Sequence, residues 1–238
     1  MSKKHTLFVE KYRPTTLENY LGNESFIKDL DEWIKNQDFP NLLLHGGPGT
    51  GKTTAAKLII SNIDCDYLYL NCSDENGIDA IRDKVRQFAS TATFKKVKVV
   101  ILDEADFLTL NAQAALRNVI ETFSLNTRFI FTCNFVERII SPLQSRLASY
   151  ALISPTPRQI YDRMVSILQE ENVEFIDKEL AHIVKTFYPE TAMSTELLEK
   201  IGNAHSREAI LGLQGKMGEL IATGDGTLLL EIQGGIAH

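Results

Sequence analysis

Long apolar runs, cysteine and surplus positive charge are all scarce in this 238-residue sequence. No run approaches the roughly 20 apolar residues that a membrane-spanning helix requires. The N-terminus, MSKKHTLFVEKYRP, has no signal-peptide apolar stretch, so we expect a cytoplasmic protein, or a nuclear one in a eukaryote. Three cysteines without a CxxC pair argue against a disulfide scaffold or a zinc finger. The formal charge of −6 disfavours broad nonspecific binding of nucleic acid but permits a local basic surface.

The sequence does contain regular alternation of short β-rich runs with helical patterns over its first 150 or so residues. The apolar runs predict strands, and apolar residues at helical spacing predict helices between them. The expected strands are 41–45, 66–71, 98–103, 128–133 and 150–153, and the expected helices are 52–62, 78–90 and 112–123. This order predicts an α/β fold with a parallel sheet that is flanked by helices on both faces.

The pattern changes at Ser154–Pro157 (SPTP), where two prolines in four residues indicate a connector. From Arg158 onward only helical patterns occur. We therefore expect an α/β domain over 1–154, a small all-helical domain over 155–223, and a glycine-rich tail over 224–238.

A glycine-rich loop between the first expected strand and the first expected helix carries the strongest motif. It reads Gly46-Gly47-Pro48-Gly49-Thr50-Gly51-Lys52-Thr53 and matches G-x-x-x-x-G-K-[ST]. Glycines allow the backbone to approach phosphate oxygens, and the loop amides and helix N-terminus direct partial positive charge at the anion. We expect Lys52 near the β- and γ-phosphates and the Thr53 hydroxyl on Mg²⁺. The alternative is a purely structural glycine turn.

Two acids, Asp103 and Glu104, end the apolar run VVILDE. A strand of this kind delivers both carboxylates to the carboxyl edge of the sheet, where ligands bind in open α/β folds. Beside a phosphate-binding loop, Asp103 would hold the hydration shell of Mg²⁺ and Glu104 would orient the attacking water. Phosphoryl transfer needs positioning and charge neutralisation more than covalent help.

Asn134 and Arg146 are further candidates that the residues alone leave open. Asn134 follows the run RFIFTC and could contact the γ-phosphate or the water, but it is equally consistent with a turn former. Arg146 could stabilise the transition state, on its own nucleotide or on a neighbour's, or could make a surface salt bridge.

Four longer strings resemble one family, the clamp-loader small subunits, which are AAA+ ATPases. This family includes the archaeal and eukaryotic replication factor C small subunits and the phage clamp-loader ATPase. The strings are VEKYRPTTLENYLGNE (9–24), HGGPGTGKTT (45–54), ILDEADFLTLNAQAALRNVIE (101–121) and NTRFIFTCNFVERIISPLQSR (126–146). The resemblance covers about residues 7–155 and weakens in the helical part.

The resemblance implies roles for individual residues. The segment Tyr12-Arg13-Pro14 would border the adenine, Gly46–Thr54 would be the Walker A loop, and Asp103 with Glu104 would be Walker B. Asn134 resembles the sensor of the γ-phosphate, and Ser145-Arg146 resembles the box whose arginine acts on the adjacent subunit's ATP. The third residue of that box is Leu147 here rather than cysteine.

The resemblance also implies a second sensor and a DNA-binding surface. Arg207 would open a lid helix and contact ATP within the same chain, although 191–204 looks like an insertion or a diverged stretch. Basic and polar side chains on helices inside the ring would follow the DNA backbone without sequence preference. The candidates are Arg82, Arg86, Asn111 and Arg117. A solvated helix face is the alternative for each of them.

The sequence therefore predicts an ATPase subunit of a sliding-clamp loader, which uses ATP and Mg²⁺ and binds other loader subunits, a clamp and primer–template DNA but no membrane. Only about 20 residues follow the expected lid, too few for the family's helical collar, so we expect a largely monomeric chain at low concentration. The rival hypotheses are a stator subunit that binds ATP without hydrolysis, and a different AAA+ remodeller such as a Holliday-junction motor or a helicase loader.

Overall fold

The structure, a computed structural model, describes residues 11–74, 78–173 and 175–188. Five strands form one parallel sheet in the order β2-β3-β4-β1-β5. Their bounds are β1 (Leu42–His45), β2 (Cys65–Asn71), β3 (Val97–Asp103), β4 (Thr127–Cys133) and β5 (Ala148–Ala151). The expected α/β fold with a parallel sheet is confirmed.

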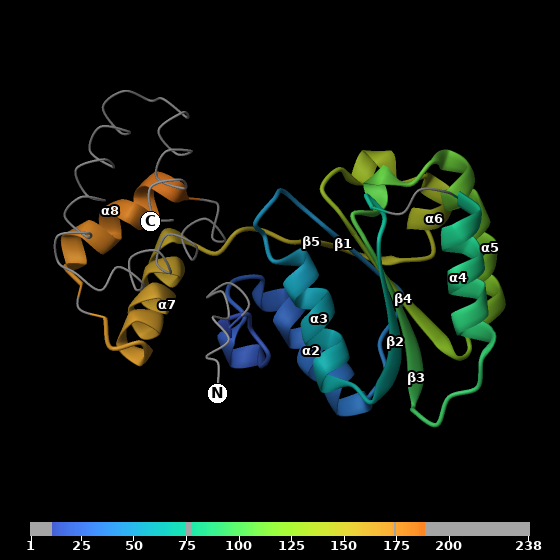
Figure 1. Cartoon of the computed structure of the whole chain (residues 1–238), viewed down its shortest axis with the longest axis horizontal. Coiled ribbons are helices and arrows are strands. Elements are labelled where there is room, and N and C mark those ends of the chain that lie inside the picture. The colour runs from blue at the N-terminus through green and yellow to red at the C-terminus, as the bar shows by residue number, and fades with distance from the viewer. Residues whose placement is uncertain (1–10, 75–77, 174, 189–238) are drawn as a thin grey trace, which may run out of the picture.

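Helices cover both faces of the sheet, as expected (Figure 1). On one face lie α2 (Glu24–Asn36) and α3 (Lys52–Asn62), and on the other lie α4 (Ile78–Ser90) and α5 (Leu110–Phe123). Alternate strand residues supply the two cores: Leu42 and Leu44 pack with α2 and α3, whereas Leu43 packs with α4 and α5. Every residue of β3 is buried, as expected for a strand covered on both sides.

Short helices complete the order. These are the 3₁₀ turns η1 (Leu17–Asn19), η2 (Ala105–Phe107) and η3 (Val136–Arg138), and the helix α6 (Ser141–Gln144). Beyond the sheet, α7 (Pro157–Glu170) and α8 (Asp177–Phe187) pack together through a separate apolar cluster that includes Ile160, Met164 and Leu180. A capping box at Thr156 and Gln159 begins α7 directly after the proline connector.

Two expectations differ from the structure. The last strand runs from Ala148 to Ala151 rather than over 150–153, because its pairing with β1 begins at Ala148, whose amide donates to the Asn41 carbonyl at 2.7 Å. The helix α2 was not predicted, although Phe26 and Leu30 are four residues apart and both are buried against the sheet. Its aromatic side chains pack edge-on with Tyr150, which places α2 beside the edge strand β5.

Candidate functional site

The phosphate-binding loop connects β1 to α3 through three glycines whose conformations L side chains rarely adopt. Gly46 has φ of +144°, Gly49 has φ of +73° and Gly51 has φ of +86°. A Cβ at Gly46 would lie 2.2 Å from the Leu152 carbonyl oxygen, so the chain leaving β5 allows no side chain there. The loop therefore depends on the close approach of two backbone segments as well as on its own sequence.

Lys52 and Thr53 are the first residues of α3, where the helix N-terminus favours an anion. The Lys52 ammonium donates to the carbonyl oxygens of Gly46 and Gly47 at 2.9 and 2.7 Å. Burial lowers the pKa of Lys52, while the neighbouring carboxylates act in the opposite direction. Burial and the Lys52 cation also lower the pKa of His45. A bound anion would therefore meet a partly desolvated cation.

Asp103 lies at the carboxyl end of β3 and is almost completely buried. The Thr53 hydroxyl is 3.0 Å from both of its carboxylate oxygens, and the hydroxyls of Tyr69 and Thr132 also donate to it. These donors come from α3, β2 and β4, so three elements converge on one carboxylate. The structure thus brings the two expected Mg²⁺ ligands, Thr53 and Asp103, into direct contact.

Glu104 follows immediately, with a left-handed backbone at φ 56° and ψ 44°. This conformation costs a non-glycine residue about 1 kcal/mol. The Glu104 amide donates to the Thr132 hydroxyl at 3.0 Å, which holds the turn in place. Strain of this kind clusters at functional sites. Here the left-handed residue changes the direction of the chain directly after the end of β3.

Asn134 follows the last residue of β4, at the same carboxyl edge of the sheet as Asp103. It is half-buried, and its backbone amide donates to the Asp106 carboxylate at 3.3 Å. The expected sensor thus lies at the end of β4, the strand between β3, which ends in Asp103, and β1, which leads into the phosphate-binding loop.

The N-terminal segment reaches both α3 and α7. The Arg13 guanidinium donates to the Thr54 hydroxyl at 3.3 Å, close to the start of α3. The Tyr12 hydroxyl donates to Glu171, at the end of α7, and Arg163 of α7 donates to the Tyr12 carbonyl at 3.4 Å. The segment expected to border the adenine therefore connects the nucleotide loop with the helical part.

Arg146 lies between α6 and β5 and forms an ion pair with Glu121 near the end of α5, with Nε 2.6 Å from the carboxylate. Glu121 is eleven residues along α5 from Leu110, or about 16 Å from the end of the helix that faces the Walker B turn. Arg146 consequently contacts a surface helix rather than the phosphate loop of its own chain. The salt bridge that the sequence left open is present.

The candidate DNA-contacting residues lie on α4 and α5, which are neighbours on one face of the sheet (Figure 1). Arg86 and Asn111 are exposed, Arg82 forms an ion pair with Asp83 at 3.0 Å, and Arg117 donates to the Asn118 amide oxygen at 3.2 Å. The structure places all four in one helical layer, and their contact with DNA stays a prediction.

Some expectations fall on residues that the structure does not describe. Arg207, the divergent stretch 191–204 and the tail 224–238 all lie outside the described residues.

Three residues of the site were missed by the sequence analysis: Tyr69, Thr132 and Asp106. Tyr69 and Thr132 share one face of the sheet with Asp103, because β2 and β3 pair with Asn71 opposite Asp103 and β3 and β4 pair with Ile101 opposite Ile130. Tyr69 and Thr132 are signalled in the sequence only as a polar residue near the end of an apolar run, and Asp106 only as the second aspartate of the string DEAD.

The oxygen ligands present suit Mg²⁺ held in part by a nucleotide. Mg²⁺ commonly uses one or two protein carboxylates or hydroxyls and takes its remaining ligands from phosphate and water. Thr53 and Asp103 provide that number, and no group of three or more His, Cys, Asp or Glu side chains in the described ranges could hold a metal by itself.

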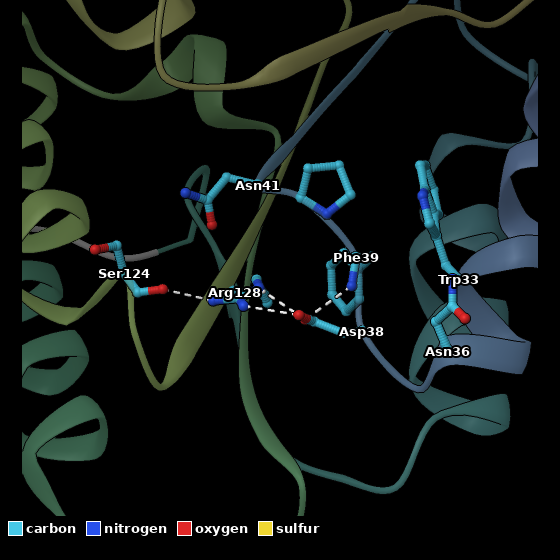
Figure 2. A pocket seen from close by; sticks show the side chains of 8 residues that line it. Trp33, Asn36, Asp38, Phe39, Asn41, Ser124 and Arg128 are labelled. Atoms are coloured by element: carbon cyan, nitrogen blue, oxygen red, sulfur yellow. Dashed lines mark hydrogen bonds and ion pairs between the residues drawn. The ribbon is translucent and has the colours of Figure 1, made fainter.

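The opposite edge of the sheet contains a hollow of about 450 Å³, lined by residues before β1 and at the start of β4 (Figure 2). Arg128 crosses it, donating to both carboxylate oxygens of Asp38 at 2.8 and 2.9 Å and to the Ser124 carbonyl at 2.6 Å. Trp33 and Phe39 form its apolar wall. Its charged groups, Arg128 and Asp38, are paired with each other, so this hollow lies at a structural joint between the α2–β1 and α5–β4 connections.

Membrane insertion through a helix finds no support in the described part of the chain, where none is both long enough and apolar enough to span a bilayer.

Comparison with protein families gives one domain match. Residues 42–155 match the family described as ATPase family associated with various cellular activities (AAA). The matched range runs from β1 to the connector after β5 and so contains the phosphate loop, Asp103, Glu104, Asn134 and Arg146.

Several proteins are similar in sequence over most of this chain. The replication factor C small subunit of Saccharolobus solfataricus is 40% identical over 200 residues, which are 81% of this chain and 61% of that protein. That of Archaeoglobus fulgidus is 38% identical over 225 residues, covering 90% and 66%, and replication factor C subunit 5 of Mus musculus is 42% identical over 185 residues, covering 74% and 55%. The chain thus spans less than two thirds of the length of these relatives.

Solved structures share the fold at lower identity. The RuvB Holliday junction branch migration motor of Thermotoga maritima superposes with a TM-score of 0.63 at 19% identity, over 93% of this chain and 72% of that one. This likeness concerns the fold alone.

Proposed function

Because this chain belongs to the AAA ATPases and is a relative of the replication factor C small subunits, we propose that it is the ATPase subunit of a sliding-clamp loader. In this role it binds Mg·ATP, contacts neighbouring loader subunits, and uses hydrolysis to release a clamp on primer–template DNA. The proposal for the whole assembly rests on the sequence similarity, and the proposal for the chemistry rests on the site.

One observation carries the chemical part: the Thr53 hydroxyl lies 3.0 Å from both oxygens of Asp103, directly before the left-handed turn at Glu104. This contact joins the phosphate-binding loop to the acidic strand end. A hydroxyl and a carboxylate in contact form the protein's share of a Mg²⁺ site, and a second carboxylate beside them supplies a group for the water.

The residues divide the work of phosphoryl transfer among them. The loop amides and Lys52 bind the β- and γ-phosphates, while Thr53 and Asp103 hold the ion and its hydration shell. Mg²⁺ bound with the nucleotide supplies neutralisation of the triphosphate charge. Glu104 orients the attacking water, and the Asn134 side chain contacts the γ-phosphate. Tyr12 and Arg13 border the adenine from the segment that also contacts α7.

Arg146 acts on the nucleotide of an adjacent subunit in this proposal. Its ion pair with Glu121, about 16 Å along α5 from the Walker B end, supports action outside its own site. An arginine supplied by a neighbour contributes roughly 10³–10⁵-fold to turnover in related phosphoryl-transfer enzymes. An isolated chain should therefore bind ATP and hydrolyse it slowly.

The sliding clamp, the other loader subunits and DNA are the partners we propose. Arg82, Arg86, Asn111 and Arg117 would follow the DNA backbone from α4 and α5. Replacing Arg82 and Arg86 together should weaken DNA binding and flatten its salt dependence, since each phosphate contact releases counterions.

The test of the function is Glu104→Gln, measured with the clamp, primed DNA and the other loader subunits. The amide keeps the shape of the side chain but cannot orient and polarise water as a carboxylate does. We expect ATP affinity within about twofold of wild type and a loss of at least about 100-fold in turnover. Glu137→Gln, an exposed carboxylate on η3, is the matched control and should leave turnover unchanged.

The outcomes separate the alternatives. A wild-type chain that binds ATP but shows no turnover even in the assembled loader would indicate a non-hydrolysing stator. The second candidate is the Holliday-junction motor that the sequence analysis left open, and the fold shared with RuvB is compatible with it. Capture of four-way junction DNA in preference to a clamp would support that candidate and contradict the clamp-loader proposal.

A further inference from the structure

Asp106 is a buried acid that the chemistry proposed above does not use. It lies in η2, three residues after Asp103, and only 6% of its surface is exposed. Its side chain reaches the turn that follows β4 rather than its own strand end.

One carboxylate oxygen makes both of the contacts with that turn. Oδ2 of Asp106 accepts hydrogen bonds from the backbone amides of Asn134 at 3.3 Å and Phe135 at 3.2 Å. Hydrogen bonds to a charged acceptor are stronger than those between neutral groups. The acid therefore ties the turn that carries Asn134 to the turn that carries Glu104.

The other oxygen has no partner. Oδ1 of Asp106 is buried and accepts no hydrogen bond from the described residues. Burying a carboxylate with half of its hydrogen-bonding capacity unused is costly. The cost of desolvating this carboxylate therefore opposes the stability gained from its two hydrogen bonds with backbone amides. This balance indicates that Asp106 serves to hold the turn rather than to stabilise the fold.

The position of the acid links it to the phosphate side of the site. Its charge raises the pKa of Lys52 against the effect of burial, so the carboxylate lies within electrostatic reach of the ammonium that faces the phosphates. It acts in the same direction on Cys133, whose thiol has its pKa raised to about 12 mainly by burial. Asp106 thus contacts the turn after β4 and lies within electrostatic reach of Lys52.

We propose that Asp106 is a positioning residue for the γ-phosphate sensor, because its Oδ2 holds the Asn134 and Phe135 amides and so directs the Asn134 side chain towards the nucleotide. This inference rests on the proposed function, since it takes Asn134 as the sensor. In this proposal Asp106 acts through the turn and does not itself bind the nucleotide. Its removal should therefore reproduce the loss of Asn134 without adding to it.

The experiment measures the affinity of the full chain for ADP and for the slowly hydrolysed analogue ATPγS. The ratio of the two affinities reports recognition of the γ-phosphate without requiring turnover. We expect Asn134→Ala and Asp106→Ala each to lower the preference for ATPγS about tenfold, with ADP affinity unchanged. The double variant should show the same loss as either single variant, since both remove one interaction.

Amide hydrogen exchange measures the anchor itself. In Asp106→Ala the amides of Asn134 and Phe135 should lose protection. Asp106→Asn keeps one acceptor oxygen and should recover most of the amide protection and most of the preference for ATPγS. Because this variant keeps the shape of the side chain, it tests the anchor even if the alanine variant does not fold. Glu137→Gln is the control for charge on the same connection and should change neither quantity.

Three results would overturn the proposal. Unchanged protection of the two amides in both Asp106 variants would show that the carboxylate does not hold the turn. Equal loss of ADP and ATPγS affinity, or additive losses in the double variant, would show that Asp106 acts through the fold or on another group. If Asn134→Ala kept the wild-type preference for ATPγS over ADP, Asn134 would not be the sensor, and this inference would fail with that part of the proposed function. Loss of amide protection in Asp106→Ala would then show that the anchor exists but does not serve nucleotide recognition.

Discussion

The charged groups at the amino edge of the sheet and those at its carboxyl edge have different partners. At the amino edge, Arg128 and Asp38 neutralise each other through two hydrogen bonds. At the carboxyl edge, Asp103 accepts hydrogen bonds from the hydroxyls of Thr53, Tyr69 and Thr132. Within the described residues, neither Asp103 nor Glu104 forms an ion pair. The charged pair at the amino edge is closed within the protein, whereas the carboxyl edge presents a hydrogen-bonded carboxylate without an ion pair among the described residues, which suits the Mg²⁺ site proposed above.

Left-handed backbone is denser at the carboxyl edge than at the amino edge. Gly46, Gly49, Gly51 and Glu104 have positive φ at the carboxyl edge, whereas Gln37, the C-cap of α2, has it beside the amino edge. Strained conformations persist where the surroundings over-determine them and where a site requires them. The contrast indicates that the carboxyl edge is built for a ligand at a cost in stability, and that the amino edge serves the fold.

The largest expected effect comes from Gly46→Ala, which challenges the idea that the carboxyl edge depends on backbone approach. The new Cβ would lie 2.2 Å from the Leu152 carbonyl oxygen, so either the loop or the chain after β5 must move. We expect ATP affinity to fall by more than about 100-fold and the free energy of unfolding to fall by about 3 kcal/mol.

Gly47→Ala is the matched control, since nothing lies within 4 Å of the position of its Cβ. Its free energy of unfolding should stay close to that of wild type, and its ATP affinity, by fluorescence titration, should fall far less than in Gly46→Ala. Equal losses in both variants would show that loop flexibility rather than this contact matters.

A smaller effect is expected from Tyr69→Phe, which tests whether the hydroxyls hold Asp103 for the cation. Without the phenol, the carboxylate loses one of its donors and more readily leaves the orientation that faces Thr53. Mutation of a residue that hydrogen-bonds to a metal ligand commonly lowers metal affinity by 10-fold or more. We therefore expect the Mg²⁺ concentration for half-maximal nucleotide binding to rise about tenfold.

Nucleotide binding in EDTA should be unaffected by the same substitution, because no phosphate contact is removed. Tyr67→Phe, an exposed tyrosine on the same face of β2, is the control. A Mg²⁺ dependence identical to wild type would mean that Tyr69 does not position the carboxylate.

The smallest effect concerns the amino edge. Arg128→Ala removes the bidentate pair with Asp38 and the bond to the Ser124 carbonyl. Since Asp38 is about half exposed, we expect a loss of about 1 kcal/mol in the free energy of unfolding, by urea denaturation. ATP affinity should not change. Arg158→Ala, which breaks an exposed pair on α7, should have almost no effect on either quantity.

A drop in ATP affinity in Arg128→Ala would contradict the division of the two edges. It would mean that the hollow at the amino edge is coupled to the nucleotide site through the strands β1 and β4 that connect them.

Much of the fold was predictable from local pattern. The helices α3 and α4 have the predicted bounds, and four of the strands agree within one residue, because apolar runs and helical spacing report burial directly. The strand β5 was displaced by two residues, since pairing with β1 rather than its own apolar residues sets where it begins. The helix α2 was overlooked despite a regular apolar stripe.

The sequence by itself determined the parts of the site that are contiguous along the chain: the glycine loop with Lys52 and Thr53, and the acids at the end of β3. Parallel strands end at one edge, so these parts had to meet. Tertiary structure alone decided which side chains complete them. Tyr69, Thr132 and Asp106 act on residues of other elements through strand register and turn geometry, and Arg146 is directed to Glu121 by the packing of α5 and α6. These partners depend on distances between segments far apart in the chain, which local spacing does not encode.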